Sequence, residues 1–357
     1  MKLKMILLAA AMVLLTACTE GGAPENSGTE QSEPVTSSTT TEENTTTEAT
    51  TTEAVTTTEE EVKEPYPEET SPAEDFKYVV SEMYYGTGIN EIIITGYLGT
   101  SAEVIIPEEI EDAPVVKIAD SAFQDNTLIA SVTVPESVHT IGAKAFKDCT
   151  NLVTVTLYNH KSLTLGQFAF HQCESLTSIN LPDYMNAIPT LAFAACTSLT
   201  EITIPKSIIF IDEAAFISCE SLTTVNISEG EGIVALETIF DMAFVDCPSL
   251  QSIYIPSTVK DVGSMAFAHC KSLTDVTIAD GVENIHSGAF LGCTALTGIN
   301  IPAGTNLIGD CVVGYRYQEK DDGSTELVVD PDFTITCAAG SPAEKYAIEN
   351  GIAYVTI

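Results

Sequence analysis

The sequence contains no tryptophan and few basic residues: 14 Lys and Arg stand against 51 Asp and Glu, which gives a formal net charge of −37. A surface this acidic repels phosphate backbones and anionic lipid headgroups, so nucleic acid is excluded as a partner. The lack of tryptophan argues against a sugar-binding module, because such modules stack sugar rings on exposed aromatic side chains.

Sequence motifs of catalysis are also missing. No H-E-x-x-H, G-x-S-x-G or glycine-rich phosphate loop occurs. Carboxylate pairs are expected by chance in so acidic a chain, and they would need a defined cleft to act on a glycosidic bond. We therefore expect a non-enzymatic protein with no catalytic residue and no cofactor. The histidines are scattered over unrelated repeat positions: His139, His160, His171, His269 and His286.

The cysteines lack the spacing of a metal site. Zinc sites use C-x-x-C or Cys/His pairs, whereas most of the 10 cysteines here recur at intervals of about 23 residues. The acidic segment 321–326 offers oxygen ligands for calcium, but it lacks the alternating ligand spacing of an EF-hand. A solvated turn is the favoured interpretation, and no metal site is expected.

The N-terminus has the form of an export signal. Lys2 and Lys4 precede an apolar run, Met5–Leu15, that is too short to span a membrane as a helix. The Leu-Thr-Ala-Cys that ends this region resembles the bacterial lipobox, which implies cleavage between Ala17 and Cys18 and lipidation of Cys18. Residues 1–17 would then be a lipoprotein signal peptide. The alternative is an ordinary secretion signal in which Cys18 is incidental.

Residues 18–75 form a Thr/Glu-rich segment of low complexity. From Thr19 to Asp75 it holds 16 acidic residues and one lysine, with almost no aliphatic side chains. So little apolar surface cannot offset the entropy of ordering, and we expect a disordered linker that acts as a stalk. Its many threonines leave O-glycosylation open.

From about Phe76 the sequence is repetitive. The pair Ala-Phe recurs at intervals of 23 or 24 residues, with one interval of 28. A cysteine follows most of these phenylalanines by three residues, and a leucine follows each cysteine by three; Asn126 takes the cysteine position in the first unit. A fixed period of this length indicates a solenoid, whose units bury their apolar faces against their neighbours. The phenylalanines are Phe123, Phe146, Phe170, Phe193, Phe216, Phe244, Phe267 and Phe290, and the cysteines are Cys149, Cys173, Cys196, Cys219, Cys247, Cys270 and Cys293.

The unit over residues 192–205 shows how one coil is built. Leu199, Ile202 and Ile204 are expected to point inward, and the alternation of apolar and polar residues predicts a short strand. Pro205 ends the strand because it has no N–H for a continuing ladder. A second apolar pair precedes the next Ala-Phe: Ile208 and Ile211.

The running pattern Ala-Phe-x-x-Cys-x-x-Leu-x-x-Ile-x-Ile-Pro resembles the BspA-like class of bacterial leucine-rich repeats, over residues 102–302. The resemblance implies a leucine-rich-repeat solenoid, a curved rod with a parallel β-sheet on one side and short helical or turn segments on the other. Ser228 and Ala279 depart from the pattern at the proline position. The long unit after Ser228, with Glu229–Gly232 among its extra residues, should form a loop without breaking the core.

The end coils need caps, because they would otherwise expose apolar edges. We assign residues 76–118 to an N-terminal cap with a degenerate first coil, 119–301 to the repeats, and 302–357 to a C-terminal cap. The C-terminal cap is predicted to contain a hairpin turning at 320–324, a helix over 341–351 and a strand over 352–357.

The repeated cysteines should stack as a buried column of free thiols, since free cysteine packs as a small hydrophobe. A thiol in this position can also meet backbone groups of the turn, which explains how Asn126 can replace it. Cys311 and Cys337 lie outside the column. They are expected to be buried free thiols, with a disulfide between them as the alternative in an exported protein.

Side chains that alternate with the core residues of the strands should face solvent. They are mostly short, uncharged and hydrogen-bonding, with Tyr254 as the one aromatic among them. Such residues suit exposed strand positions in any case, yet repeat solenoids commonly bind partners on their sheet side. We therefore take this surface as the candidate binding face. Its residues include Glu201, Thr203, Thr224, Asn226, Tyr254, Asp275, Thr277 and Asn300.

Together these features predict a non-catalytic, lipid-anchored protein of the bacterial surface that mediates protein–protein interaction or adhesion. The family resemblance implies host matrix or neighbouring-cell surface proteins as partners. A monomer is expected, in contact with the membrane through its lipid anchor only. The alternatives are a carbohydrate-binding or scaffold component of a surface polysaccharide-utilising system, and a structural envelope lipoprotein.

Overall fold

The computed structural model describes residues 66–81, 90–158, 162–228, 236–320 and 322–357. The predicted signal peptide, the lipidation site Cys18 and the linker up to Pro65 lie outside the described residues, as does the insertion at 229–235. The chain divides into two units, Met1–Pro65 and Tyr66–Ile357, and the second holds all of the repeats.

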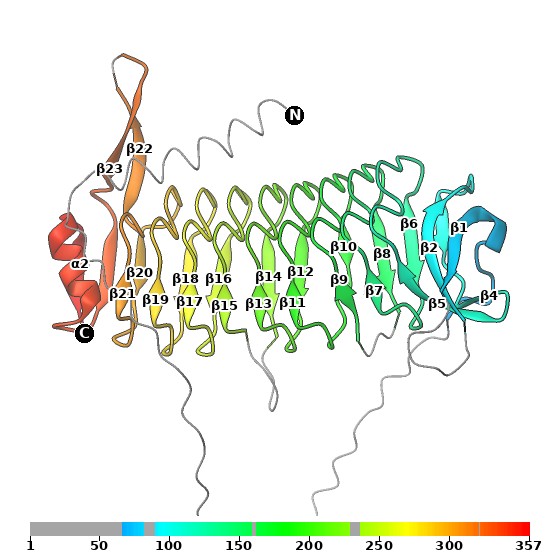
Figure 1. Ribbon diagram of the computed structural model, residues 1–357. Helices are drawn as coiled ribbons and strands as arrows, with labels where there is room; N and C mark the ends of the chain where they lie inside the picture. Colours follow the sequence, from blue (N-terminus) through cyan, green and yellow to red (C-terminus); the bar gives the residue numbers. More distant parts are fainter. Residues whose placement is uncertain (1–65, 82–89, 159–161, 229–235, 321) are drawn as a thin grey trace, which may run out of the picture. The chain divides into compact units, whose positions relative to one another are not determined.

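Successive coils of the second unit contribute short parallel strands that lie side by side, here called the first ladder (Figure 1). In the strand Glu201–Ile204, Ile202 and Ile204 are buried while Glu201 and Thr203 face solvent, as predicted. Paired strands are in register, so equivalent repeat positions form columns. The strands of the first ladder are β3 (Glu103–Ile105), β6 (Ser131–Val134), β8 (Thr154–Leu157), β10 (Ser178–Ile179), β12 (Glu201–Ile204), β14 (Thr224–Ile227), β16 (Ser252–Ile255), β18 (Asp275–Ile278) and β20 (Gly298–Asn300).

A second ladder of parallel strands, absent from the sequence-based prediction of a sheet on one side, runs along another side of the same coils. Most of its strands have two residues, such as Phe210–Ile211, which is too short for alternation to show in the sequence. Ile211 is fully buried and Phe210 is half-buried. The strands of the second ladder are β5 (Ala113–Ile118), β7 (Thr140–Ile141), β9 (Thr164–Leu165), β11 (Ala187–Ile188), β13 (Phe210–Ile211), β15 (Thr238–Ile239), β17 (Asp261–Val262), β19 (Asn284–Ile285) and β21 (Leu307–Ile308).

The remainder of each coil is made of turns. Two residues per coil adopt left-handed backbone, one directly before the Ala-Phe pair and one directly before the cysteine. In one coil these are Ala214, with φ of 54°, and Ser218, with φ of 61°. Most of these residues are not glycine, although left-handed backbone costs an L-residue roughly 1–2 kcal/mol. Packing of the side chains that follow therefore imposes the shape of the turn.

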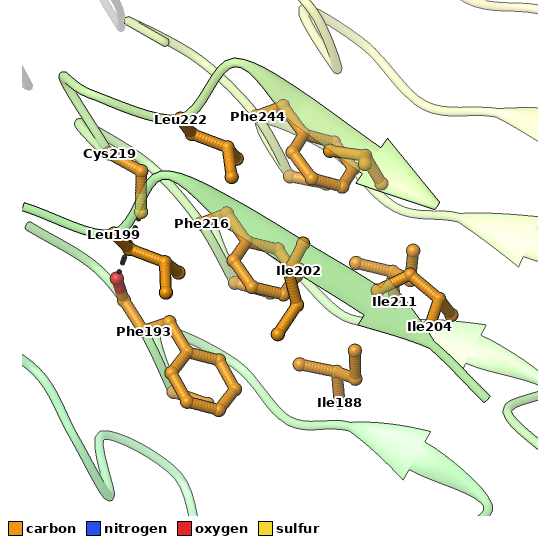
Figure 2. Packing of buried hydrophobic residues seen from close by; sticks show 14 of the residues in the cluster. Ile188, Phe193, Leu199, Ile202, Ile204, Ile211, Phe216, Cys219, Leu222 and Phe244 are labelled. Carbon is orange, nitrogen blue, oxygen red and sulfur yellow. Dashed lines mark hydrogen bonds between the residues drawn. The ribbon is translucent and has the colours of Figure 1, made fainter. Parts of the chain in front are cut away.

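The interior consists of columns, each built from one repeat position. The phenylalanines of the Ala-Phe pairs stack from Phe123 to Phe290, with successive ring centroids 4.8 to 5.5 Å apart. Figure 2 shows Phe193, Phe216 and Phe244 one above the other. The stack continues across the long unit, since the rings of Phe216 and Phe244 are 5.1 Å apart. The prediction that the insertion leaves the core intact is confirmed.

The predicted cysteine column is confirmed as well. All seven repeat cysteines are buried free thiols, and each donates its S–H to the carbonyl oxygen of a phenylalanine in the preceding coil, at 3.0 to 3.3 Å. The bond from Cys219 to Phe193 is drawn in Figure 2. In the first coil the amide oxygen of Asn126 instead accepts from the N–H groups of Leu128 and Ile129. Asn126 thus replaces a bond to the neighbouring coil with bonds inside its own turn.

The N-terminal end is closed by an antiparallel pair, β1 (Phe76–Ser81) and β2 (Glu91–Tyr97), and by a hairpin of β4 (Glu109–Ile110) with β5. Residues 66–75, which the sequence placed in the linker, pack on this end. The N–H of Ser71 donates to the carbonyl of Ile105 at 2.8 Å, and its hydroxyl accepts from the N–H of Ile105 at 3.0 Å. These bonds cover the open edge of β3, so the folded part includes residues 66–75.

The predicted hairpin, helix and final strand at the C-terminal end are present. Ser341 caps the helix by accepting from the N–H of Glu344 at 3.3 Å, and Gly351 ends it with a φ of 67°. The helix has nine residues, and in the described part of the chain no helix is long and apolar enough to cross a membrane. The elements are β22 (Tyr315–Glu319), β23 (Thr325–Val329), α2 (Pro342–Asn350) and β25 (Ala353–Thr356).

The solenoid continues past Pro302, where the sequence period fails. The strand β24 (Thr334–Cys337) pairs in parallel with both β20 and β25, so two further strands extend the first ladder. The hairpin β22–β23 is inserted before β24 and hides the period. Cys311 and Cys337 form no disulfide with each other, and the first is half-buried while the second is buried.

Candidate interaction surfaces

The outward side chains of the first ladder from β6 to β20, mostly two per strand, form one continuous surface, here called the first-ladder face. Alternation creates it: with Ile202 and Ile204 in the core, Glu201 and Thr203 must face solvent. The structure brings the predicted binding residues together on this face, and all are exposed apart from the half-buried Thr224. They lie on β12 (Glu201, Thr203), β14 (Thr224, Asn226), β16 (Tyr254), β18 (Asp275, Thr277) and β20 (Asn300).

Neighbouring coils exchange hydrogen bonds on this face. The amide of Asn226 donates to the carboxylate of Glu201 at 2.5 Å, which joins β14 to β12. The hydroxyl of Thr223 donates to the carbonyl of Thr200 at 3.0 Å in the same two coils. Such pairs restrict the side chains before any partner arrives, which lowers the entropy that binding must remove.

One polar residue of the face has a structural role instead. Asn180 follows the short strand β10, and its side chain accepts from the N–H of Leu157 at 2.9 Å and donates to the carbonyl of Leu157 at 2.8 Å. The amide therefore completes the ladder where the backbone of β10 stops. Asn180 keeps one amide N–H and one lone pair of its oxygen for a partner.

The charge of the first-ladder face is negative. Glu201 and Asp275 are its carboxylates, and neither Lys nor Arg occupies an outward position from β6 to β20. Tyr254 supplies an aromatic side chain that is 42% exposed. The face therefore offers hydrogen bonds from short polar groups and attraction for a cationic partner.

The second ladder exposes an aromatic pair that the sequence analysis missed. Phe210 is the outward residue of β13, and Phe240 directly follows β15 in the next coil; their ring centroids are 6.0 Å apart and the rings are tilted by 60°. Phe240 is 41% exposed and Phe210 is half-buried. Both are phenylalanines outside the repeated Ala-Phe position, and this departure is the signal that the sequence offers. Only the second ladder shows that the two side chains lie on the same surface.

Other coils place smaller or polar residues at these two positions. The core requires the apolar residue between them, such as Ile211, while at the position of Phe240 several coils have a glycine that packs directly on the backbone of the preceding coil. Equivalent to Phe210 are Thr140, Thr164, Ala187, Thr238, Asp261, Asn284 and Leu307, and equivalent to Phe240 are Gly142, Gly166, Pro189, Asp212, Gly263, His286 and Gly309.

Polar contacts tie the later coils of the second ladder together. Lys260 pairs with Glu283 at 3.1 Å, and the imidazole of His286 lies 3.6 Å from the carboxylate of Asp261. These groups are about half exposed, so each pair contributes little to stability. The carboxyl of Asp212 lies beside the aromatic pair. Burial raises its pKa, and a hydrogen bond with the backbone opposes this rise in part.

Ionisable side chains with shifted pKa values occupy structural positions. Burial raises the pKa of the repeat thiols Cys149 and Cys293 to about 12, which keeps them protonated near neutral pH. Burial lowers the pKa of His269, whose ring stacks on Tyr317 with centroids 5.8 Å apart. Among the described residues, no group of three or more His, Cys, Asp or Glu side chains could hold a metal ion.

Most of the repeat region is similar to a known family of repeat proteins. Residues 116–234 and 234–316 match the model of the BspA type leucine rich repeat region, in six copies. A leucine-rich-repeat protein of T. pallidum is 28% identical, with 64% of this chain and 91% of that chain covered and a TM-score of 0.48. A leucine rich cell surface protein of Faecalibacterium prausnitzii is 20% identical, with 81% and 94% covered and a TM-score of 0.50. No curated protein matches. Because the family model covers more than half of the 357 residues, this chain belongs to the family of BspA-type leucine-rich-repeat proteins.

Proposed function

We propose that this chain is an exported, lipid-anchored protein of the bacterial surface whose first-ladder face binds a protein of a host matrix or of a neighbouring cell. The observation that carries the proposal is the row of exposed, hydrogen-bonding side chains that crosses adjacent coils from Glu201 to Asn300. A row of this extent suits a protein surface better than a small molecule, which needs a concave site. The proposed role is binding without catalysis.

Two other roles compete with this proposal. One is a carbohydrate-binding or scaffold component of a surface polysaccharide-utilising system, and the other is a structural envelope lipoprotein with no specific ligand. A pull-down with host matrix proteins and a glycan array separate the three roles. Capture of a matrix protein supports the proposal, binding to glycans alone supports the second role, and failure of both supports the third.

Replacing both Tyr254 and Thr277 with alanine is expected to weaken binding of the captured protein at least about tenfold, because large aromatic contacts and their neighbours carry much of a typical interface energy. Both side chains are exposed, so the fold should be unaffected. Biolayer interferometry with the immobilised partner measures the change. Gln167→Ala, exposed in a turn remote from the first ladder, is the matched control and should bind as the wild type does. Equal affinities for all three proteins would contradict the proposed face.

The lipid anchor has a separate test. Cys18→Ala should abolish incorporation of a radiolabelled or clickable fatty acid and leave the protein either uncleaved or released into the medium, because the thiol of Cys18 is the acyl acceptor that the lipobox resemblance implies. Replacing a buried cysteine of the repeats, such as Cys196, with alanine should leave the labelling intact. Unchanged labelling of Cys18→Ala would show that the signal is an ordinary secretion signal.

A further inference from the structure

We infer that the second ladder carries a docking site, distinct from the first-ladder face, for a polypeptide segment that combines apolar side chains with Lys or Arg. The site is the aromatic pair Phe210 and Phe240 with the carboxylates around it, here called the aromatic patch. It lies where β13 and β15 run side by side near the middle of the solenoid (Figure 1).

Phe240 is exposed and Phe210 is half-buried. The core is complete without either ring, because Ile211 and Ile239 are fully buried and fill the inward positions of the same two strands. Phe240 nonetheless occupies a position where other coils have mostly glycine or polar residues, and its side chain is 41% exposed. Exposed apolar groups in contact with one another are typical of binding surfaces.

The two rings of the pair differ in orientation. The rings of Phe210 and Phe240 touch at a centroid distance of 6.0 Å but are tilted by 60°, so they present no common plane. A sugar ring can stack on one of them only, whereas an aliphatic or aromatic side chain can contact both at once. The geometry therefore favours a polypeptide over a glycan.

Charge decides the kind of polypeptide that the pair can bind. The segments 206–213 and 236–241 hold four acidic residues and one lysine. In the following coil the ammonium of Lys260 is engaged by Glu283 at 3.1 Å and by the carbonyl of Gly281 at 3.2 Å, so it does little to offset this charge. A cationic segment is attracted and an acidic one is repelled. The charged residues of the two segments are Lys206, Asp212, Glu213, Glu237 and Asp241.

Charge also excludes two other occupants, namely the Thr/Glu-rich segment of this chain and a second copy of the chain. The Thr/Glu-rich segment of residues 18–65 is strongly acidic, and a second copy of the chain brings a net charge of −37 of its own. Both would be repelled by the carboxylates of the aromatic patch. The occupant is therefore a different, basic polypeptide.

The test uses a short synthetic peptide of Leu and Lys with a single Trp, titrated into the full-length chain. Because the chain has no tryptophan, the indole emission reports on the peptide alone. We expect a blue shift on binding, at least about tenfold weaker binding by the double variant Phe210→Ala/Phe240→Ala, and weaker binding at higher salt. Phe240→Ala alone, at an exposed position, should show the same direction of change if the double variant folds poorly.

Three results would overturn the inference. Unchanged affinity in both phenylalanine variants would mean that diffuse charge alone attracts the peptide. Equal binding of a peptide with Glu in place of Lys would remove the role of the carboxylates. Glycan-array signals that are lost in Phe240→Ala would assign the aromatic patch to sugars. Tyr254→Ala, on the first-ladder face, should bind the Leu/Lys peptide as the wild type does, so this inference and the proposed function fail separately.

Discussion

The free energy of unfolding is expected to fall by up to about 8 kcal/mol between neutral pH and about pH 10, because of the cysteine column. Burial raises the pKa of six of its thiols above the ordinary value of 9.0. A fall of this size is comparable to the whole stability of a typical domain, so alkaline unfolding near pH 10 is the expected result. The six residues are Cys149, Cys173, Cys196, Cys247, Cys270 and Cys293.

The direction follows from which state loses protons first. Below pH 9 both the folded and the unfolded chain keep these thiols protonated, and the stabilisation is fully present. Above pH 9 the unfolded chain ionises while the folded chain does not, so each thiol favours unfolding by about 1.4 kcal/mol per pH unit. The loss continues until the folded pKa is reached, which is about 12 for Cys149 and Cys293.

Urea denaturation at several pH values, under reducing conditions, measures this loss. The matched control is Cys196→Ala/Cys270→Ala, which starts from a lower stability but has two fewer titrating thiols. Its fall between neutral pH and pH 10 should be smaller by about 3 kcal/mol. Tyrosines with raised pKa values, such as Tyr66 and Tyr346, titrate alike in both proteins and cancel in the comparison. Identical pH dependence in the two proteins would rule out the thiols as its cause.

The solenoid and its columns could be predicted because each coil repeats one inward pattern. Phe193, Cys196 and Leu199 recur at fixed spacing in every neighbour, and only stacked coils bring such positions together. The first-ladder face followed from the same pattern, since the alternation that buries Ile202 exposes Thr203. Repetition thus predicted both the core and the face opposite to it.

The second ladder could not be predicted, because a two-residue strand has no period. The sequence shows Ile208 and Ile211 as an apolar pair, but it does not show that the residues around Ile211 pair in register with those around Ile239. The aromatic patch depends on that register, which places Phe240 in contact with Phe210. A site formed by residues that break the repeat pattern therefore needs the structure to be found.

The prediction of a disordered linker is wrong for a polar segment that is held by backbone hydrogen bonds. Residues 66–75 have the composition of the linker, yet Ser71 binds the edge of β3 through its backbone and its hydroxyl. Composition predicts burial of side chains and says little about backbone pairing. The same limit applies to β24, whose pairing with β20 is hidden by the inserted hairpin.

Leu199→Asp is expected to destabilise the protein by about 4 kcal/mol or more, because it places an unpaired carboxylate between coils in the absence of any compensating partner. Leu199 is fully buried and lies beside the phenylalanine stack in the middle of the solenoid (Figure 2). Since each coil contacts mainly its neighbours, disruption here should also uncouple the coils on either side and make urea unfolding less cooperative.

Thr200→Asp is the matched control for this prediction. It adds the same carboxylate one residue later, at an exposed position. The hydroxyl of Thr223 donates to the backbone carbonyl of Thr200, which the substitution leaves in place. Its effect should stay within about 0.5 kcal/mol, as for most surface substitutions. Urea denaturation followed by circular dichroism compares the two variants with the wild type at neutral pH, where the cysteine column is fully protonated. Equal stabilities for Leu199→Asp and Thr200→Asp would mean that the leucine column does not hold the coils together, and the physical basis of the fold given above would be wrong.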